Sequence, residues 1–483
     1  MIRTRFAPSP TGYLHIGGVR SALFNWLFSH RHGGKYVLRI DDTDQQRNIE
    51  AALAPILHGF HWLGLDWDEG IEVGGPHGTY RQTDRVERYR QVAHEMVAAG
   101  VAYYDGATAE QLEAIRLEAE SAGATPVYDG RHRLSEAEAR SRIAAGDPPP
   151  VRLGFSRPGI TVFDDVVRGT IEFDHANVDD FVVLRSDGSP IYHLASTVDD
   201  VDYGITHVIR GEDILPSTPK HLLITAAMGA PAPSYAHLSL LNGPDGKKLS
   251  KRHGDTALRA YRDAGFLPEA LRNFLAILGW SPGEDEEIVS LDTMIERFDL
   301  GAVSRNPAVF DVAKLEWMNG QYLRAMAPGD FAVEAITRSA AAAGRQLTDG
   351  EQSAVTALAP VVQERVKRLT DIAPQFRFLL EGDLEIEQDS WDKVMRGPEA
   401  ARALAAATSA LEAVTDWSTA SIEASLREML SSSGLSAAKG LQPVRVAVSG
   451  SAVSPPLFES LATLGRDRSL ERIGAALRRL SPQ

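Results

Sequence analysis

A stretch near the start of the chain carries residue types whose spacing suits the binding of a phosphate. It reads R-F-A-P-S-P-T-G-Y-L-H-I-G-G from Arg5 to Gly18, and it should leave a strand, turn at its prolines and enter a helix near His15. The first turn of a helix offers unpaired N–H groups and positive potential to an anion. Gly17 and Gly18 would let a nucleotide approach the backbone closely, and His15 could donate to a phosphate oxygen. A strand-to-helix turn with a capping histidine is the alternative, because short glycine motifs often match by chance.

A second stretch, G-K-K-L-S-K-R at Gly246–Arg252, is strongly basic, and five of its seven residues can donate to anionic oxygens. Lysine ammonium groups stabilise a phosphoryl-type transition state when they lie where negative charge develops. An isolated basic cluster is more often a solvated loop. In an acidic chain that also carries the first stretch, the functional interpretation is favoured.

The composition narrows the class of protein. The 483 residues include 65 acidic and 50 basic side chains, which gives a net charge of −15. With 43% hydrophobic and 24% charged residues, the chain is globular rather than disordered or fibrous. No apolar run approaches the ~18 residues that would span a bilayer. The absence of cysteine excludes disulfides, thiolate nucleophiles, iron–sulfur clusters and cysteine-based zinc sites.

The charge balance and the N-terminal sequence bear on the setting of the protein. An acidic chain is a poor candidate for coating nucleic acid nonspecifically, although it can still present one basic face. The N-terminus lacks a basic stretch followed by an apolar segment. We therefore expect a cytoplasmic enzyme. The length suggests about three domains of ~150 residues each.

The elements that must position the two stretches alternate between strands and helices in the first half of the chain. Strands are expected at 2–6, 36–40, 181–185 and 206–210, and helices at 17–31 and 85–99. A strand, a helix and a strand within ~40 residues predict the βαβ unit of a parallel sheet. Between about 100 and 180, a charged helix at 109–120 and a triple proline interrupt this pattern, which indicates an insertion. From about Pro244 the pattern is helical, with one core-facing helix after Pro268.

The two stretches, in this order, resemble the HIGH and KMSKS signatures of class I aminoacyl-tRNA synthetases. Further segments look like the glutamyl/glutaminyl branch: I-D-D-T-D at 40–44, G-G-P-H-G-T-Y-R-Q at 74–82, Y-H-L-A at 192–195 and V-I-R-G-E-D at 208–213. V-F-D-V-A-K-L-E-W-M-N at 309–319 and P-V-R-V-A-V-S-G at 443–450 resemble the bacterial glutamyl-tRNA synthetases in particular. The resemblance covers nearly the whole chain.

The resemblance implies an α/β Rossmann catalytic domain with an α+β insertion, followed by all-α stem-contact and anticodon-binding domains. The expected divisions are a first catalytic half at 1–99, an acceptor-stem-binding insertion at 100–180, a second catalytic half at 181–243, a stem-contact domain with the K-L-S-K-R loop at 244–326, and two helical anticodon-binding subdomains at 327–380 and 381–483. The divisions near 100, 180 and 244 agree with the changes of pattern described above.

The implied activity is the ATP-dependent ligation of L-glutamate to the 3′ end of tRNA-Glu through a glutamyl-adenylate, by a monomer, with Mg²⁺ accompanying ATP. The resemblance carries a role to each matched residue. His15, Gly17, Gly18 and Lys251 would contact ATP, and Lys251 would neutralise the α-phosphate with help from Lys248 and Arg252. Glutamate would be held by Arg5, Ser9, Asp41, Tyr192 and Arg210, with Asp41 on the α-ammonium and the two arginines on carboxylates. Arg365 would read the third anticodon base.

The chain departs from the family pattern at a few positions. Many members have glutamate where this chain has Asp41, and asparagine is often found where Ser196 stands. Some relatives bind structural zinc through cysteines in the insertion. Here the corresponding segments hold a lone His132, which cannot make a tetrahedral site, and we predict no zinc.

Several alternatives stay open on the sequence. A non-discriminating enzyme would also charge tRNA-Gln, and only anticodon preference separates it from the discriminating one. A glutaminyl enzyme is less favoured because that branch has β-barrel anticodon domains. A truncated relative that modifies a tRNA base lacks an anticodon region altogether. A catalytically inactive RNA- or nucleotide-binding paralogue is disfavoured by the intact Arg5, His15, Arg210 and Lys251.

Overall fold

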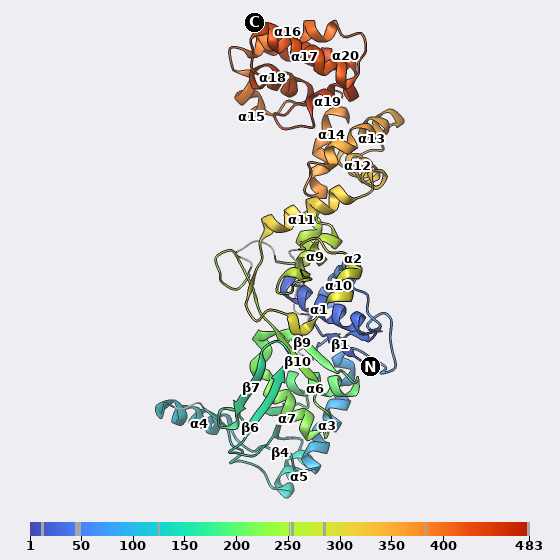
Figure 1. Ribbon diagram of the computed structural model, residues 1–483. Helices are drawn as coiled ribbons and strands as arrows, with labels where there is room; N and C mark the ends of the chain where they lie inside the picture. The colour runs from blue at the N-terminus through green and yellow to red at the C-terminus, as the bar shows by residue number, and fades with distance from the viewer. Residues whose placement is uncertain are drawn as a thin grey trace. The chain divides into compact units, whose positions relative to one another are not determined.

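The computed structural model describes residues 1–10, 14–43, 50–123, 126–250, 252, 256–283, 286–380, 382 and 384–480 (Figure 1). The chain divides into two compact units, Met1–Arg262 with Pro268–Val312 and Asp263–Leu267 with Ala313–Gln483. None of the described helices is long and apolar enough to cross a membrane.

The first unit contains parallel strands that begin at the N-terminus. β1 (Arg3–Phe6), β2 (Lys35–Leu38) and β3 (Glu69–Gly70) pair in parallel in the order β1-β2-β3. β9 (His207–Gly211) and β10 (Ser234–Leu238) form a second parallel pair. The backbone N–H of Thr206 donates to the carbonyl of Arg3 at 3.0 Å, which places the start of β9 beside β1. The strands expected at 2–6, 36–40 and 206–210 are therefore present, each displaced by one or two residues at its ends.

Helix α1 (Ile16–Arg31) follows β1 and forms the βαβ unit with β2. Its side chains Ile16, Val19, Leu23 and Leu27 are buried, which is the stripe that a 3.6-residue period directs into a core. The chain reverses at Gly33, where φ is 57°. The other described helices of this unit are α2 (Leu53–Leu63), α3 (Val86–Ala98), α6 (Tyr192–Asp202), α7 (Thr218–Ala227), α8 (Leu258–Asp263, whose last residue belongs to the second unit), α9 (Pro268–Ile277) and α10 (Leu291–Arg297), apart from those in the segment between α3 and α6.

The segment between α3 and α6 forms two further sheet regions. β4 (Ala102–Tyr104), β5 (Val151–Leu153) and β8 (Val182–Leu184) make an antiparallel sheet in the order β4-β5-β8. The strand expected at 181–185 thus exists, but it belongs to this sheet and not to the parallel strands, so the βα pattern resumes at α6. A short β-branched run identifies a strand but does not identify its partner. Helices α4 (Ala109–Ser121) and α5 (Glu136–Ala144) complete the segment, and α4 projects from it with no buried residue (Figure 1).

A hairpin joins this segment to the parallel strands. β6 (Ile160–Asp165) and β7 (Gly169–Asp174) pair antiparallel, and Asp165 at the end of β6 pairs in parallel with Tyr235 of β10. The sheet order is therefore β7-β6-β10-β9. β11 (Leu241–Asn242) and β12 (Ala308–Val309) form a short parallel pair after β10, which interrupts the helical pattern expected from Pro244 onward.

The described residues of the second unit form helices joined by turns and loops, with no strand among them. Its helices are α11 (Val312–Ala325, whose first residue belongs to the first unit), α12 (Pro328–Ala343), α13 (Asp349–Gln363), α14 (Ile372–Leu380), α15 (Gln388–Ser390), α16 (Ala400–Glu412), α17 (Thr419–Ser433), α18 (Ala437–Ser449), α19 (Leu457–Leu464) and α20 (Arg466–Leu480). The helices α12, α13 and α14 pack together through buried side chains that include Phe331, Val355 and Phe376, whereas α16 packs on α17, α18 and α20.

Candidate active site

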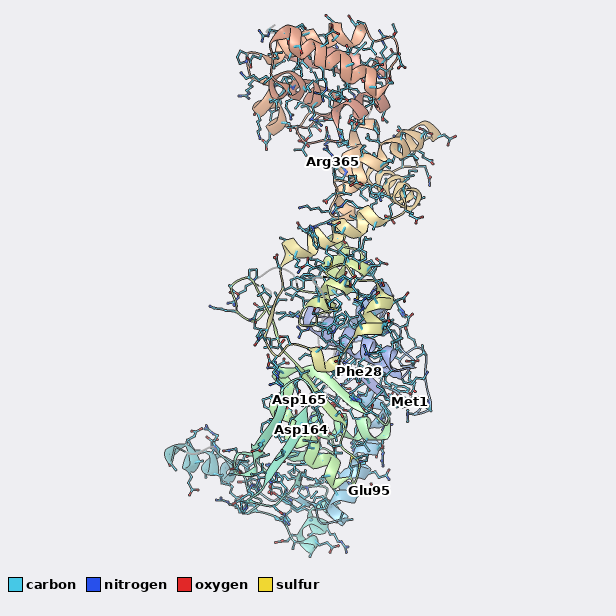
Figure 2. The ribbon with its side chains drawn as sticks, viewed as in Figure 1. Met1, Phe28, Glu95, Asp164, Asp165 and Arg365 are labelled. Carbon is cyan, nitrogen blue, oxygen red and sulfur yellow. The ribbon has the colours of Figure 1, made fainter. Side chains whose placement is uncertain are left out.

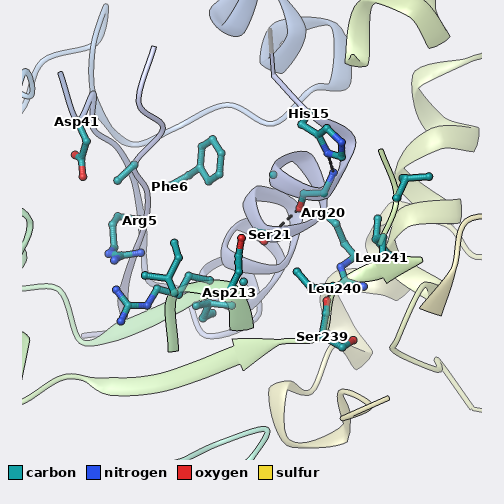
Figure 3. Close-up of a pocket in the computed structure, with 18 of the residues that line it drawn as sticks. Arg5, Phe6, His15, Arg20, Ser21, Asp41, Asp213, Ser239, Leu240 and Leu241 are labelled. Carbon is teal, nitrogen blue, oxygen red and sulfur yellow. Dashed lines mark hydrogen bonds between the residues drawn. The ribbon is translucent and has the colours of Figure 1, made fainter. Parts of the chain in front are cut away.

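A pocket of about 420 Å³ opens at the carboxyl ends of β1 and β9, which is where open α/β sheets bind their ligands. Figure 3 shows Arg5 and Asp41 on one side of it and His15 on the other. The residues that the sequence predicted and that line the pocket are Arg5, His15, Gly17, Gly18, Asp41, Tyr192, Arg210 and Lys248. Ser9 is exposed and is not among the described residues that line it. Lys251 lies outside the described residues.

The His15 side of the pocket is the N-terminus of α1. The His15 side chain caps the helix, and its Nδ1 accepts a hydrogen bond from the Gly17 N–H at 3.1 Å. A neutral imidazole with Nδ1 as acceptor carries its proton on Nε2, so the ring can cap the helix and still donate to a ligand. Partial removal from water and the charge of Lys248 both lower the pKa of His15, which favours this neutral form. A Cβ on Gly17 would lie 3.4 Å from the capping Nδ1.

The basic stretch reaches the pocket through Lys248. The backbone N–H of Leu249 donates to Leu241 at 2.8 Å, which fixes this part of the stretch to β11. Lys248 Nζ lies 3.6 Å from Asp213 Oδ2, and Arg252 Nη2 lies 3.3 Å from Asp245 Oδ2, with all four side chains substantially exposed. Exposed ion pairs of this kind contribute little, so both cations can exchange their carboxylates for a phosphate at small cost. Arg252 does not line the pocket in its described position.

Arg210 lies at the other side of the pocket, near the end of β9, and is 6% exposed. Its Nε donates to His237 Nε2 at 3.1 Å, and its Nη2 donates to Thr218 Oγ1 at 2.9 Å. Nη1 is buried and has no hydrogen-bond partner within the described part of the chain. Burial lowers the pKa of Arg210. A buried guanidinium with an unused donor carries an unpaid desolvation cost that an anionic ligand would relieve.

A buried network of charges includes Arg5 and Asp41, which line the pocket. Arg39 is 0% exposed; its Nε donates to Asp41 Oδ1 at 2.7 Å and its Nη1 to Asp200 Oδ1 at 2.7 Å. Arg5 donates from Nε to the same Asp200 Oδ1 at 3.1 Å. Ser196 accepts from Arg39 Nη2 at 3.1 Å and lines the pocket.

Sequence reasoning missed Arg39, Asp199 and Asp200 as part of this site. The signal was present but ambiguous: an arginine inside an apolar strand and two consecutive aspartates in the helix that begins at Tyr192. Buried charges require partners, and Asp199 lies 3.6 Å from Arg39 Nε with both side chains at 0% exposure. Nothing in the spacing identifies which aspartate meets which arginine, because the contacts join the residue after β2 to α6 across more than 150 residues, as between Arg39 and Asp200.

Arg365 lies in the second unit (Figure 2). Helix α13 ends at Gln363, and Arg365 is exposed in the turn that follows. The side-chain amide of Gln363 donates to the carbonyls of Leu323 at 2.9 Å and Met326 at 2.8 Å, which ties the helix end down. Burial and the charge of Arg365 lower the pKa of Arg445, so two arginines lie near each other here.

His132 lies in the insertion, where its ring stacks on Tyr128 with the centroids 6.4 Å apart. In the described ranges, no three histidine, cysteine or acidic side chains are grouped as a metal site would require. The absence of zinc stays a prediction.

Comparison with known proteins agrees with this arrangement. Residues 1–317 match the family described as tRNA synthetases class I (E and Q), catalytic domain. The chain belongs to this family. The synthetase also matches a family described as an anticodon binding domain over residues 330–477. The expected fold class, a class I catalytic domain followed by an all-helical anticodon-binding region, is thereby confirmed.

Similar proteins cover the synthetase almost completely. It is 41% identical to glutamate–tRNA ligase 2 of Rubrobacter xylanophilus, with 100% of this chain and 98% of the relative aligned. It is 42% identical to a glutamate–tRNA ligase of Dehalococcoides mccartyi over 99% and 98% of the two chains. Among solved structures, a glutamate tRNA ligase from Elizabethkingia meningosepticum in complex with its amino acid gives a TM-score of 0.88 at 34% identity, over 99% and 100% of the chains.

Proposed function

We propose that this synthetase ligates L-glutamate to the 3′ end of tRNA-Glu, using ATP and passing through a glutamyl-adenylate. The observation that carries the proposal is Arg210, a buried guanidinium whose Nη1 has no hydrogen-bond partner among the described residues and which lines a pocket facing the N-terminus of α1. One side of the pocket suits a carboxylate and the opposite side suits a phosphate. Relatives named glutamate–tRNA ligase align over the full length and support the same reaction.

Each substrate group has a complementary residue. The side-chain carboxylate of glutamate would take the free donor of Arg210, and the α-ammonium would lie against Asp41. Arg5 and Tyr192 also line the pocket and would orient the α-carboxylate. That carboxylate attacks the α-phosphorus of ATP and pyrophosphate leaves; the terminal ribose hydroxyl of tRNA then attacks the carbonyl carbon and AMP leaves. No covalent enzyme intermediate is needed, so catalysis consists of positioning and charge stabilisation.

ATP would lie against the N-terminus of α1, with His15 Nε2 donating to a phosphate oxygen and Gly17 and Gly18 leaving the backbone accessible. Lys251, assisted by Lys248 and Arg252, would neutralise charge on the α-phosphate. Mg²⁺ is held mainly by substrate phosphates and water in such sites, and the exposed Asp213 at the pocket suits this mode. When bound, the ion supplies charge neutralisation on the phosphates.

The tRNA would contact three regions: the insertion at 100–180 at the acceptor end, the region from Arg305 to Arg324 at the inner stem, and the helical region at 327–380 and 381–483 at the anticodon. Loop bases are recognised by hydrogen bonds and by stacking on aromatic or guanidinium planes. Arg365 is exposed after α13 near Arg445, which supports an anticodon contact. We further propose that the enzyme acts as a monomer in the cytoplasm and holds no zinc.

The proposal is tested by charging purified tRNA-Glu and tRNA-Gln side by side with labelled glutamate, ATP and Mg²⁺. Charging of tRNA-Glu alone supports the discriminating ligase. Charging of both retains the reaction but replaces the discriminating enzyme with a non-discriminating one. Charging of neither favours a binding paralogue without catalytic activity.

Substitution of Arg365 by glutamine is expected to relax the choice of tRNA. Because one well-placed contact to a base contributes ~1–3 kcal/mol of discrimination, the ratio of kcat/KM for tRNA-Glu over tRNA-Gln should fall about tenfold or more. The matched control is Arg396→Gln, since Arg396 is also an exposed arginine of the second unit and pairs with Asp392. An unchanged ratio in Arg365→Gln would remove the anticodon role of this residue.

Glutamate affinity is expected to fall as the pH is lowered through 6. Burial raises the pKa of Asp41 to about 6, Arg39 opposes the shift, and Asp199 and Asp200 add to it. Asp41 therefore loses its negative charge as pH falls through this value, and the α-ammonium loses its partner. Titration of one group with this pKa predicts that the Kd for glutamate rises about fourfold from pH ~7.5 to ~5.5. Calorimetric titration across this range measures the effect. Asp41→Asn should bind more weakly and show a flatter profile; parallel profiles would contradict the role of Asp41.

A further inference from the structure

His237 is a buried histidine on β10 that makes hydrogen bonds through both ring nitrogens. It is 0% exposed. Its Nδ1 lies 2.6 Å from Asp165 Oδ2, and its Nε2 accepts from Arg210 Nε at 3.1 Å. An arginine Nε–H can only donate, so Nε2 must be unprotonated and the ring proton must lie on Nδ1. The imidazole is thereby fixed as a neutral ring that donates to Asp165 and accepts from Arg210.

Asp165 is held in place by the backbone around it. Its Oδ1 accepts hydrogen bonds from the backbone N–H groups of Val167 at 3.0 Å and Arg168 at 2.8 Å. Both carboxylate oxygens also lie within 3.2 Å of the backbone nitrogen of His237. Burial acts to raise the pKa of Asp165, but the hydrogen bonds from His237 and Arg168 hold it below the ordinary value. The carboxylate is thus ionised and oriented before any ligand arrives. It lies at the end of β6, outside the parallel strands β9 and β10 (Figure 2).

Arg210 makes a second hydrogen bond that orients its guanidinium, and the acceptor of this bond is neutral like His237. Nη2 donates to Thr218 Oγ1 at 2.9 Å, and the same hydroxyl lies 3.1 Å from His237 Nε2. Two separate nitrogens of the guanidinium are therefore held, which sets the plane of the group. Because both acceptors are neutral, neither cancels the positive charge. Direct contact with the Asp165 carboxylate would neutralise the guanidinium, but the ring of His237 lies between the two groups.

We propose that Asp165 and His237 are positioning residues that orient the guanidinium of Arg210 toward the side-chain carboxylate of glutamate and preserve its charge for that carboxylate. This inference rests on the proposed function. Nη1 has no hydrogen-bond partner among the described residues, and as a charged donor it favours a carboxylate, which can accept ionic hydrogen bonds, over the neutral amide of glutamine. The hairpin of the insertion thereby contributes to amino-acid selection.

The test uses two substitutions of His237 that separate the two nitrogens. In His237→Gln the side-chain amide reaches the place of Nε2 and offers an oxygen to Arg210. In His237→Asn the amide reaches only the place of Nδ1, where it can contact Asp165 but not Arg210. Hydrogen bonds to charged groups contribute ~1.5–3 kcal/mol. We therefore expect the KM for glutamate to rise about 10- to 100-fold in His237→Asn and by no more than about threefold in His237→Gln.

The readouts separate positioning from general damage. The KM for ATP and the midpoint of thermal unfolding should change by the same small amounts in both variants. The preference for glutamate over glutamine should fall in His237→Asn alone. Asp165→Asn is a second variant that keeps the volume of the side chain, and it should also raise the KM for glutamate and leave that for ATP unchanged. His207→Asn, on β9 and outside the pocket, is the control.

The inference would be overturned if the KM for glutamate rose equally in the two His237 variants, or if the KM for ATP rose in parallel. Either result would mean that Asp165 and His237 have a structural role only. A KM for glutamate within twofold of the wild type in His237→Asn and Asp165→Asn would overturn it as well. Failure of the wild-type enzyme to use glutamate is a different result, because it would overturn the proposed function itself.

Discussion

Replacement of Lys251 by alanine is expected to lower the rate of adenylate formation about 100- to 1,000-fold, the usual effect of removing a donor that stabilises transition-state charge. The affinity for glutamate should stay within about threefold, because the ammonium group would act on the α-phosphate and not on the amino acid. Leu249, in the same basic stretch, is hydrogen-bonded to β11, and Lys248 lines the pocket. Rapid-quench measurement of adenylate, with tRNA-Glu present, gives the rate.

Lys247→Ala is the matched control for this prediction. Lys247 belongs to the same basic stretch, but it is exposed and does not line the pocket. Its substitution removes one positive charge from the segment and should change the rate by less than about threefold, as expected for an exposed and screened charge. If Lys251→Ala instead raised the KM for glutamate with unchanged turnover, the role assigned to Lys251 would be wrong.

Substitution of Arg210 by alanine should raise the KM for glutamate by about 30- to 5,000-fold. Truncation of one member of a buried, hydrogen-bonded charge pair costs ~2–5 kcal/mol, and each ~1.4 kcal/mol is tenfold in affinity. Arg210→Lys restores the charge without the planar fork, and its effect should fall between those of wild type and Arg210→Ala. Steady-state aminoacylation with varied glutamate measures all three enzymes.

The KM for ATP provides the internal control, because ATP is proposed to lie at the opposite side of the pocket. It should change by less than about threefold in both Arg210 variants, as for an uncoupled site. Arg185→Ala removes an exposed arginine outside the pocket and should leave both KM values unchanged. A rise of the two KM values together would indicate collapse of the pocket and would contradict a specific contact with glutamate.

The parts of the site that could be predicted from the sequence are those that lie within one motif or at the end of one strand. Arg5, His15, Gly17 and Gly18 share a single strand-turn-helix segment, so their proximity follows from local structure. Arg210 could be added because parallel strands direct their carboxyl ends to one edge of a sheet. The family resemblance supplied the roles, which spacing alone does not determine.

The supports of these residues could not be predicted, because they depend on pairings between distant segments. Asp165 and His237 are 72 residues apart, and neither strand carries a motif that would link the two residues. The pairing of β8 with β5 and the end of α13 at Gln363 depend likewise on tertiary contacts. Local propensity identified these elements, but it did not identify their partners or all of their ends.

The parallel pairing of β6 with β10 limits how freely this enzyme can be taken apart. A shortened enzyme in which a tight loop replaces the β6–β7 hairpin would leave β10 as an edge strand and would remove Asp165 from His237. A chimera that receives this hairpin from a relative with another amino-acid preference would inherit that relative's neighbour to His237. Exchange of this hairpin therefore replaces a residue in contact with His237, so an exchange meant to leave the surroundings of Arg210 unchanged must keep the native end of β6.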